Sequence, residues 1–259
     1  MTTLGLFAKH PQPGHVKTRL ADFLGPERAA GVYAAFVRDL VGRFGGTADR
    51  RVLCITPATD DAQTYFQCLA SGGCKPSENG CLPSTHSGGL RPPLAGSEPE
   101  GHYDLWPQPE IDLGGRMTSF FRDQLRDPTD RVVLIGSDSP TLPREFVEQA
   151  FVMLGEADIV LGPATDGGYY LVGMRGRCWP IFDGVEWSRP TVLANTIDRV
   201  HQAGATLALL PLWYDVDTEA DFHLLRGHVA GLIHAGQANI LPATARLLGL
   251  DRESATSGL

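Results

Sequence analysis

Short apolar runs alternate with amphipathic stretches along most of this chain of 259 residues, and no other feature constrains its fold as strongly. Six runs predict strands, because they are short, apolar and mostly bounded by Gly, Pro or Asp. They lie at residues 4–8, 52–56, 132–136, 159–161, 169–172 and 206–210. Strands that alternate with helices predict an α/β fold with a mostly parallel central sheet flanked by helices.

The stretches between these runs repeat apolar residues every three or four positions, which predicts helices. The clearest of them covers residues 26–44. Pro143 and Pro190 each open a further helix, since proline is tolerated in the first helical turn. Residues 219–232 predict a fourth helix, and another is expected to begin near Val16.

Charge and hydropathy exclude two classes of partner. The chain has 30 acidic against 22 basic residues and a formal net charge of −8, which disfavours binding to a nucleic-acid backbone. No apolar run approaches the roughly 18–20 residues that span a bilayer, so we expect no membrane partner. The first residues lack the pattern of a signal peptide, and we therefore expect a cytoplasmic protein.

The chain has five cysteines, and this odd number argues against a disulfide framework. Cys68, Cys74 and Cys81, with His86 nearby, raise the question of a zinc site, but their spacings are wider than the usual pattern of zinc ligands. Free thiols in a loop are the favoured interpretation.

Residues 72–101 interrupt the pattern, because 16 of these 30 positions are Gly, Pro or Ser. Such a segment cannot bury enough apolar surface to offset its ordering entropy. We expect a flexible surface insertion within one domain that covers residues 1–250. Residues 251–259 predict a disordered tail.

Three cations follow the first predicted strand within eleven residues: Lys9, Lys17 and Arg19. Pro11, Pro13 and Gly14 turn the loop that carries them. Ligands of open α/β sheets bind beyond the carboxyl ends of strands, so this loop predicts a site for a di- or triphosphate. The alternative is a solvated basic face of a helix. The glycine that precedes the lysine of a P-loop is missing, and so is the dinucleotide fingerprint G-x-G-x-x-G.

Asp138 follows the buried run at 132–136 and predicts a ligand for a divalent cation that bridges phosphates. The alternative, that it caps the next helix, is less favoured because Pro143 opens that helix several residues later. The surrounding residues lack the spacing of a nucleophile elbow.

Further candidates stand at other turns. Asp166 precedes Gly167, Gly168 and Tyr169, a pattern that allows a ligand to lie against the backbone but also fits a plain turn. Asp215 and Asp217 precede a helix and can complete a metal site, although Asp217 or Thr218 is also a good helix N-cap. Arg116 stands near a helix start, where it can meet a base, ribose or phosphate or remain exposed.

Six segments together resemble the bacterial glycosyltransferase-like family once catalogued as a domain of unknown function, some members of which are called arsenosugar-biosynthesis glycosyltransferases. They are residues 8–20, 113–117, 136–143, 161–171, 185–188 and 215–218. The family belongs to the nucleotide-diphospho-sugar transferase superfamily, whose relatives include guanylyltransferases. The resemblance implies a single GT-A (Rossmann-like) domain of three layers.

The resemblance also implies roles for individual residues. Nucleotide and phosphate binding falls to Lys9, Pro13, Gly14, Lys17, Thr18, Arg19 and Arg116. Asp138 stands where the superfamily binds its metal, Mg²⁺ or Mn²⁺, with Asp217 or Asp215 as a second ligand. The sugar or acceptor side is formed by Gly167, Gly168, Tyr169 and Trp187. Asp138 and Asp166 are the expected catalytic residues, with Asp166 as the base.

These expectations lead to one principal reaction: transfer of a sugar from a nucleoside-diphosphate sugar to a small-molecule acceptor, assisted by a metal. The same loop and metal also suit nucleotidyl transfer from a nucleoside triphosphate with release of pyrophosphate. A third alternative is a module that binds nucleotide sugars without turnover.

Overall fold

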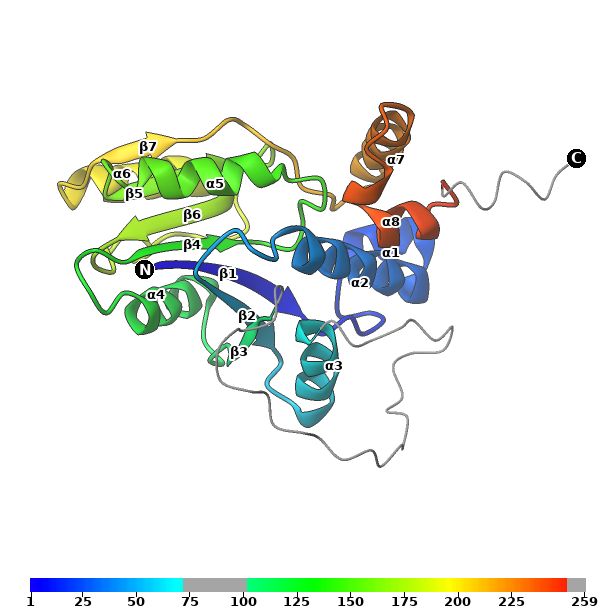
Figure 1. Ribbon diagram of the computed structural model, residues 1–259, viewed down its shortest axis with the longest axis horizontal. Helices are drawn as coiled ribbons and strands as arrows, with labels where there is room; N and C mark the ends of the chain where they lie inside the picture. Colours follow the sequence, from blue (N-terminus) through cyan, green and yellow to red (C-terminus); the bar gives the residue numbers. More distant parts are fainter. Residues whose placement is uncertain (72–101, 251–259) are drawn as a thin grey trace, which may run out of the picture.

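The computed structural model describes residues 1–71 and 102–250. Their centre is a seven-stranded sheet in the order β3-β2-β1-β4-β6-β5-β7 (Figure 1). The strands are β1 (Thr2–Lys9), β2 (Arg50–Thr56), β3 (Asp104–Pro107), β4 (Arg131–Ile135), β5 (Ile159–Pro163), β6 (Tyr169–Arg175) and β7 (Leu207–Leu209). β6 runs antiparallel to β4 and β5, and every other pairing in this sheet is parallel. The predicted α/β fold with a mostly parallel sheet is therefore confirmed.

Alternate residues of the central strands enter two separate cores, as expected for strands covered on both faces. In β4, Val133 and Ile135 face one core, whereas Val132 and Leu134 face the other. The first core is closed by α2 (Pro26–Arg43), α3 (Asp60–Ala70) and α5 (Arg144–Met153). The second is closed by α4 (Leu113–Gln124) and α6 (Val192–Gln202).

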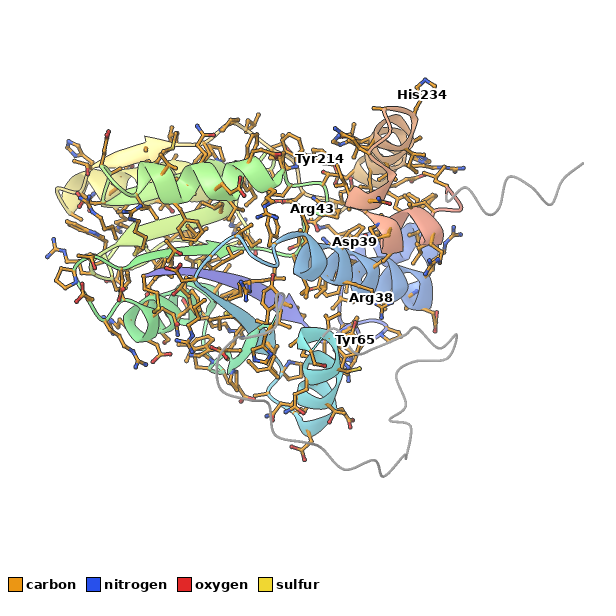
Figure 2. The ribbon with its side chains drawn as sticks, in the orientation of Figure 1. Arg38, Asp39, Arg43, Tyr65, Tyr214 and His234 are labelled. Atoms are coloured by element: carbon orange, nitrogen blue, oxygen red, sulfur yellow. The ribbon has the colours of Figure 1, made fainter. Side chains whose placement is uncertain are left out.

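A third group of helices gathers beyond the carboxyl end of β1 (Figure 1). It consists of α1 (Thr18–Leu24), α7 (Glu219–His234), the 3₁₀ helix η1 (Ala238–Ile240) and α8 (Pro242–Leu247), packed against one side of α2. Figure 2 shows Asp39 and Arg43 on α2, beside this group. The Arg43 guanidinium donates to the carbonyl oxygens of Leu142 and Ile240, both at 2.7 Å. It therefore joins the third group to the loop after β4.

The six predicted strands are all present, and two expectations about helix starts need correction. Pro143 is the N-cap of α5 rather than a residue of its first turn, and Pro190 lies before Thr191, the N-cap of α6. β3 and α3 were missed. The sequence at the start of α3 is typical of a helix N-terminus, because Thr59 caps the helix and two aspartates occupy its first turn.

The prediction of a free thiol is wrong for Cys68, which forms a disulfide bond, whereas Cys54 and Cys178 are free. An odd number of cysteines disfavours a complete framework of disulfides but leaves a single bridge possible. The predicted insertion at 72–101 and the predicted tail at 251–259 lie outside the described residues, as do Cys74, Cys81 and His86. In the described part of the chain, no helix combines the length and apolar character needed to cross a bilayer.

Candidate functional site

The loop between β1 and α1 brings Lys17 into the protein. Lys17 precedes α1 in a left-handed backbone conformation, with φ of 48°, and buried Val16 anchors the loop beside it. Only 3% of the Lys17 side chain is exposed. Its ammonium forms ion pairs with the carboxylates of Asp138 and Asp217, the latter at 2.8 Å. The cation predicted at the start of the chain thus meets acidic side chains from its middle and its end.

Backbone contacts hold the two acidic segments together. The N–H of Val216 donates to the carbonyl oxygen of Asp138 at 2.9 Å, and the hydroxyl of Ser139 donates to the carboxylate of Asp215. Thr218 is the N-cap of α7 and forms a capping box with Asp221. The side chain of Asp217 is therefore free of capping and turns toward Lys17.

Asp217 is held between two cations. Its Oδ1 contacts Lys17 Nζ, and its Oδ2 accepts a hydrogen bond of 2.8 Å from Arg19 Nη2. Burial favours the neutral acid, but the two cations outweigh it, so the pKa of Asp217 lies below its ordinary value. The same ion pairs overcome the burial of Lys17 and raise its pKa. Lys17 and Asp217 are therefore both charged at neutral pH.

Asp215 has the opposite character. Burial raises its pKa to about 6, and the nearby carboxylates of Asp138 and Asp166 act in the same direction, while the hydrogen bond from Ser139 opposes them. Sequence reasoning named Asp215 only as an alternative metal ligand. A carboxyl group with a pKa near neutrality is also suited to accept and release a proton.

Tyr33 was not predicted as a site residue. Its hydroxyl accepts a hydrogen bond of 2.9 Å from the N–H of Lys9 and lies 2.7 Å from Ser137 Oγ. Burial raises the pKa of Tyr33 to about 12, so the phenol stays neutral. It ties the end of β1 to the segment that carries Asp138. In the sequence it stands at one of the apolar helix positions, where it is indistinguishable from a core residue.

These groups border a cleft of about 910 Å³ along the edge of the sheet. The predicted site residues that line it are Lys9, Lys17, Thr18, Arg19, Arg116, Asp138, Asp166, Gly168, Tyr169, Trp187 and Asp217. Pro13, Gly14 and Gly167 do not line it. Gly14 has φ of +78°, a conformation that favours glycine, and it turns the loop between β1 and α1. Its role is therefore to shape the loop.

Apolar side chains also line the cleft. They include Leu113 and Met117 of α4 and the indole of Trp187, which lies so close to α4 that a Cβ at Gly114 would be 3.0 Å from it. Arg116 stands in the first turn of the same helix, and its Nε donates to the carbonyl oxygen of Ile111 at 2.7 Å. The lining of the cleft therefore combines charged groups, such as Lys17, with apolar and aromatic groups that suit a planar ring.

Asp166 stands at an exposed turn beside the cleft. Its Oδ1 accepts the N–H of Gly168 at 2.8 Å, which is the plain-turn interaction that the sequence also allowed. Asp166 can take part in the turn and also line the cleft, because only Oδ1 of its carboxylate is used in the turn.

The donor set suits a divalent cation of the magnesium type. Mg²⁺ takes one or two carboxylates and completes its shell with water and phosphate oxygens. Asp138 and Asp217 both reach one point, the position of Lys17 Nζ. Within residues 1–71 and 102–250, no group of three or more His, Cys, Asp or Glu side chains forms a closed metal site. Two carboxylates without further protein ligands fit an ion that arrives with phosphates rather than a permanent structural metal.

A second hollow, of about 600 Å³, lies away from these residues and is bordered by Arg131, Arg175, Arg177 and Trp179. Arg131 and Arg175 donate to backbone carbonyl oxygens, and the Arg177 guanidinium stacks 3.7 Å from the centre of the Trp179 ring. These contacts give the arginines structural partners.

Comparison with known proteins agrees with this architecture. The model of a family described as "uncharacterized protein conserved in bacteria (DUF2064)" matches residues 86–189. The crystal structure of a "putative nucleotide-diphospho-sugar transferase" from Desulfovibrio desulfuricans G20 is 28% identical, with a TM-score of 0.74, over 98% of this chain and 97% of that one. This chain therefore has a nucleotide-diphospho-sugar transferase-like fold.

Other solved structures are more distant. Rv0371c of Mycobacterium tuberculosis H37Rv is 15% identical with a TM-score of 0.45, over 86% of this chain and 96% of that one. A nucleotidyl transfer enzyme of Methanothermobacter thermautotrophicus (Mth528) is 12% identical with a TM-score of 0.49, over 88% and 97%. Both are too distant to bear on the reaction. No curated protein matches the sequence.

Proposed function

We propose that this protein transfers the sugar of a nucleoside-diphosphate sugar to a small-molecule acceptor. The observation that carries the proposal is the meeting of Lys17 and Arg19 with Asp138 and Asp217 in one cleft at the edge of the sheet. A nucleoside diphosphate needs cations and a metal site for its phosphates and a flat surface for its base. The lining of the cleft offers cations and carboxylates for the phosphates, and Leu113, Met117 and Trp187 for the base.

The proposed roles follow from position. Lys9 and Arg19 border the cleft near the carboxylates and would bind the diphosphate. Asp138 and Asp217 would hold a divalent cation, Mg²⁺ or Mn²⁺, which supplies neutralisation of the charge on the leaving diphosphate. Arg116, Trp187 and the apolar residues of α4 would position the nucleoside.

The acceptor would enter beside Asp166, Gly168 and Tyr169. Asp166 would take the proton from the acceptor hydroxyl. At the same time the oxygen of that hydroxyl would bond to the anomeric carbon, and the bond from this carbon to the diphosphate would break. Asp215, with its pKa near neutrality, lies close enough to interact with both Asp166 and Asp138 and is the second candidate for this proton.

The products distinguish the proposal from nucleotidyl transfer. The full chain is incubated with UDP, GDP, CDP, ADP and dTDP sugars, or with the nucleoside triphosphates, in Mg²⁺ or Mn²⁺. We expect slow release of a nucleoside diphosphate from one sugar nucleotide, even with water as acceptor. Release of pyrophosphate from a triphosphate would replace the proposal by nucleotidyl transfer. Binding without any turnover across a broad acceptor panel would favour the non-catalytic module.

A matched pair of variants connects the activity to the cleft. Asp138→Asn removes one charge from the proposed metal site, and we expect turnover to fall by about 10² or more. Asp123→Asn removes one charge from the exposed pair with Arg126 and should leave turnover unchanged. Equal activity in both variants would contradict the proposed site.

A further inference from the structure

Lys17 occupies the place where a metal ion is expected. Its ammonium contacts carboxylate oxygens of Asp138 and Asp217, which are the two side chains best suited to bind the cation. The side chain of Lys17 is 3% exposed, whereas Asp138 is 49% and Asp217 is 29% exposed. The ammonium is therefore enclosed, whereas both carboxylates keep exposed surface at the cleft.

The lysine and a divalent cation cannot share this position. Both are positive, and ligation by Oδ1 of Asp217 would place the metal within a few ångströms of Nζ. Arg19 also occupies Oδ2 of Asp217. The positive charges of Lys17 and Arg19 already balance the negative charges of Asp138 and Asp217. The two carboxylates therefore have little remaining attraction for a free cation.

A phosphate-bearing ligand changes this balance. Lys17 lines the same cleft as Lys9 and Arg19, and four methylene groups give its ammonium reach along the cleft wall. A diphosphate brings negative charge that a lysine can bind as a point charge. Once Nζ has moved to the phosphates, the carboxylates become available to the cation that accompanies them.

We propose that Lys17 is an internal counter-ion that occupies the cation position between Asp138 and Asp217 until a nucleotide draws it away, so that metal and nucleotide bind together and the free metal binds poorly. This inference rests on the proposed binding of a nucleoside diphosphate in the cleft. It adds an order of events: the lysine excludes metal from the empty cleft and then moves to the phosphates.

The experiment measures Mn²⁺ binding to the full chain by the loss of the free-ion signal in electron paramagnetic resonance. Without nucleotide, Lys17→Met should bind Mn²⁺ about tenfold or more tightly than the wild type, because the carboxylates lose their counter-ion. Lys9→Met is the matched control: it removes the same charge from the cleft, and the Lys9 charge acts on Asp217 without an ion pair between the two among the described residues. Its Mn²⁺ affinity should change by about threefold or less.

Adding GDP or UDP completes the test. In the wild type, the complex with the nucleotide that binds should have a higher affinity for Mn²⁺ than the protein alone or the nucleotide alone. In Lys17→Met this increase should be much smaller. Should Lys17→Met fail to fold, Lys17→Gln and the nucleotide dependence of the wild type serve in its place.

Two results would overturn the inference. The first is that Lys17→Met and Lys9→Met change the affinity for Mn²⁺ equally. The second is that the wild type binds Mn²⁺ equally well with and without a bound nucleotide. Either result leaves the proposed function standing if a sugar nucleotide is still turned over. Failure of every nucleotide to bind the wild type would instead remove the proposed function, and this inference with it.

Discussion

Gly167 illustrates how a single residue without a side chain shapes the cleft. Its φ is +89°, and a Cβ built there would lie 2.1 Å from the carbonyl oxygen of Pro190. Its own carbonyl oxygen accepts the N–H of Leu193 at 2.9 Å, at the start of α6. The turn that carries Asp166 is therefore packed directly against the segment that carries Trp187, and no larger residue fits between them.

Gly167→Ala should lower the free energy of unfolding by about 2–4 kcal/mol, because the strained φ and the backbone clash act together. Gly46→Ala is the matched control, since Gly46 has φ of +99° and nothing within 4 Å of a built Cβ. Gly46→Ala should lower the free energy of unfolding by about 1–2 kcal/mol, which is the effect of the backbone strain alone. Urea denaturation of both variants measures the difference, and equal losses would contradict the close packing at Gly167.

Single residues of the site differ in how visible they are in the sequence. Lys17 and Asp138 stand after strands, and strand position was enough to predict a phosphate site from the one and a metal ligand from the other. Tyr33 and the raised pKa of Asp215 were not predictable, because each depends on burial by segments far away in the sequence. That Lys17 would bind carboxylates instead of standing free for phosphate also required the three-dimensional arrangement.

At the scale of elements, two aspartates, one buried and one half-buried, join parts of the fold, and their contributions to stability respond to pH in opposite directions. Asp158 joins the starts of β5 and β7: it accepts from the N–H of Thr206 at 2.9 Å and from its hydroxyl at 2.7 Å, and it pairs with Arg175. Burial acts to raise its pKa, but these donors outweigh burial and lower it below 3.8. The carboxylate form thus stabilises the folded state.

Asp158→Asn should destabilise the protein by about 1 kcal/mol at pH 7. The folded pKa is lowered, so this contribution is present above the unfolded value of 3.8 and is lost as the pH falls through the folded pKa. The gap between wild type and variant should narrow between pH 5 and pH 3 in urea titrations. A gap that is constant across this range would contradict the role of the charge.

Asp39 joins α2 to α8 (Figure 2), where its carboxylate accepts the N–H groups of Ala243 and Thr244 at 2.9 and 2.8 Å. Burial raises its pKa above 3.8, and the two N–H groups only partly oppose this. A raised folded pKa means that its contribution is full below 3.8 and declines as the pH rises through the folded value.

Asp39→Asn should therefore follow the reverse trend. We expect a loss of about 1–2 kcal/mol in acid, because the amide cannot accept from both N–H groups, and a smaller loss near neutrality, where the wild type carries a buried charge. Urea titrations from pH 3.5 to pH 7 measure the gap to the wild type. A gap that widens toward neutral pH would show that the charged form is the stabilising one.

Elements were predicted well where their pattern is long or strongly apolar. The helix at 26–44 and the central strands fall into this class, because burial on one face or on both leaves a periodic record. β3 has only four residues and an exposed edge position, so its sequence lacks that record. Its strand conformation comes from pairing with β2.

At the scale of the whole molecule, the cleft is built from segments that are far apart in the chain. Lys17 and Asp217 are 200 residues apart and yet share a hydrogen bond. A ligand that binds between such segments stabilises the folded state as a whole, since the unfolded chain has no cleft.

A nucleotide present at a hundredfold excess over its Kd, together with Mg²⁺, should raise the melting temperature by about 5 °C or more. Arg19→Ala should reduce this rise, because the diphosphate loses one cation. Arg177→Ala, in the second hollow, removes the same charge elsewhere and should leave the rise intact. A thermal-shift series with UDP, GDP, CDP, ADP and dTDP sugars makes the comparison; equal effects of the two variants would place the nucleotide outside the cleft.

The sequence by itself determined the fold class, the strands of the central sheet and the carboxyl edge at which the charged residues would gather. It did so because periodic burial and strand termini are local properties of a chain. Only the tertiary structure decided which charges pair. The choice of Asp138 and Asp217 as partners of Lys17, the burial that shifts Asp215 and the packing of Trp187 on α4 depend on distances between remote segments, and no local pattern records those distances.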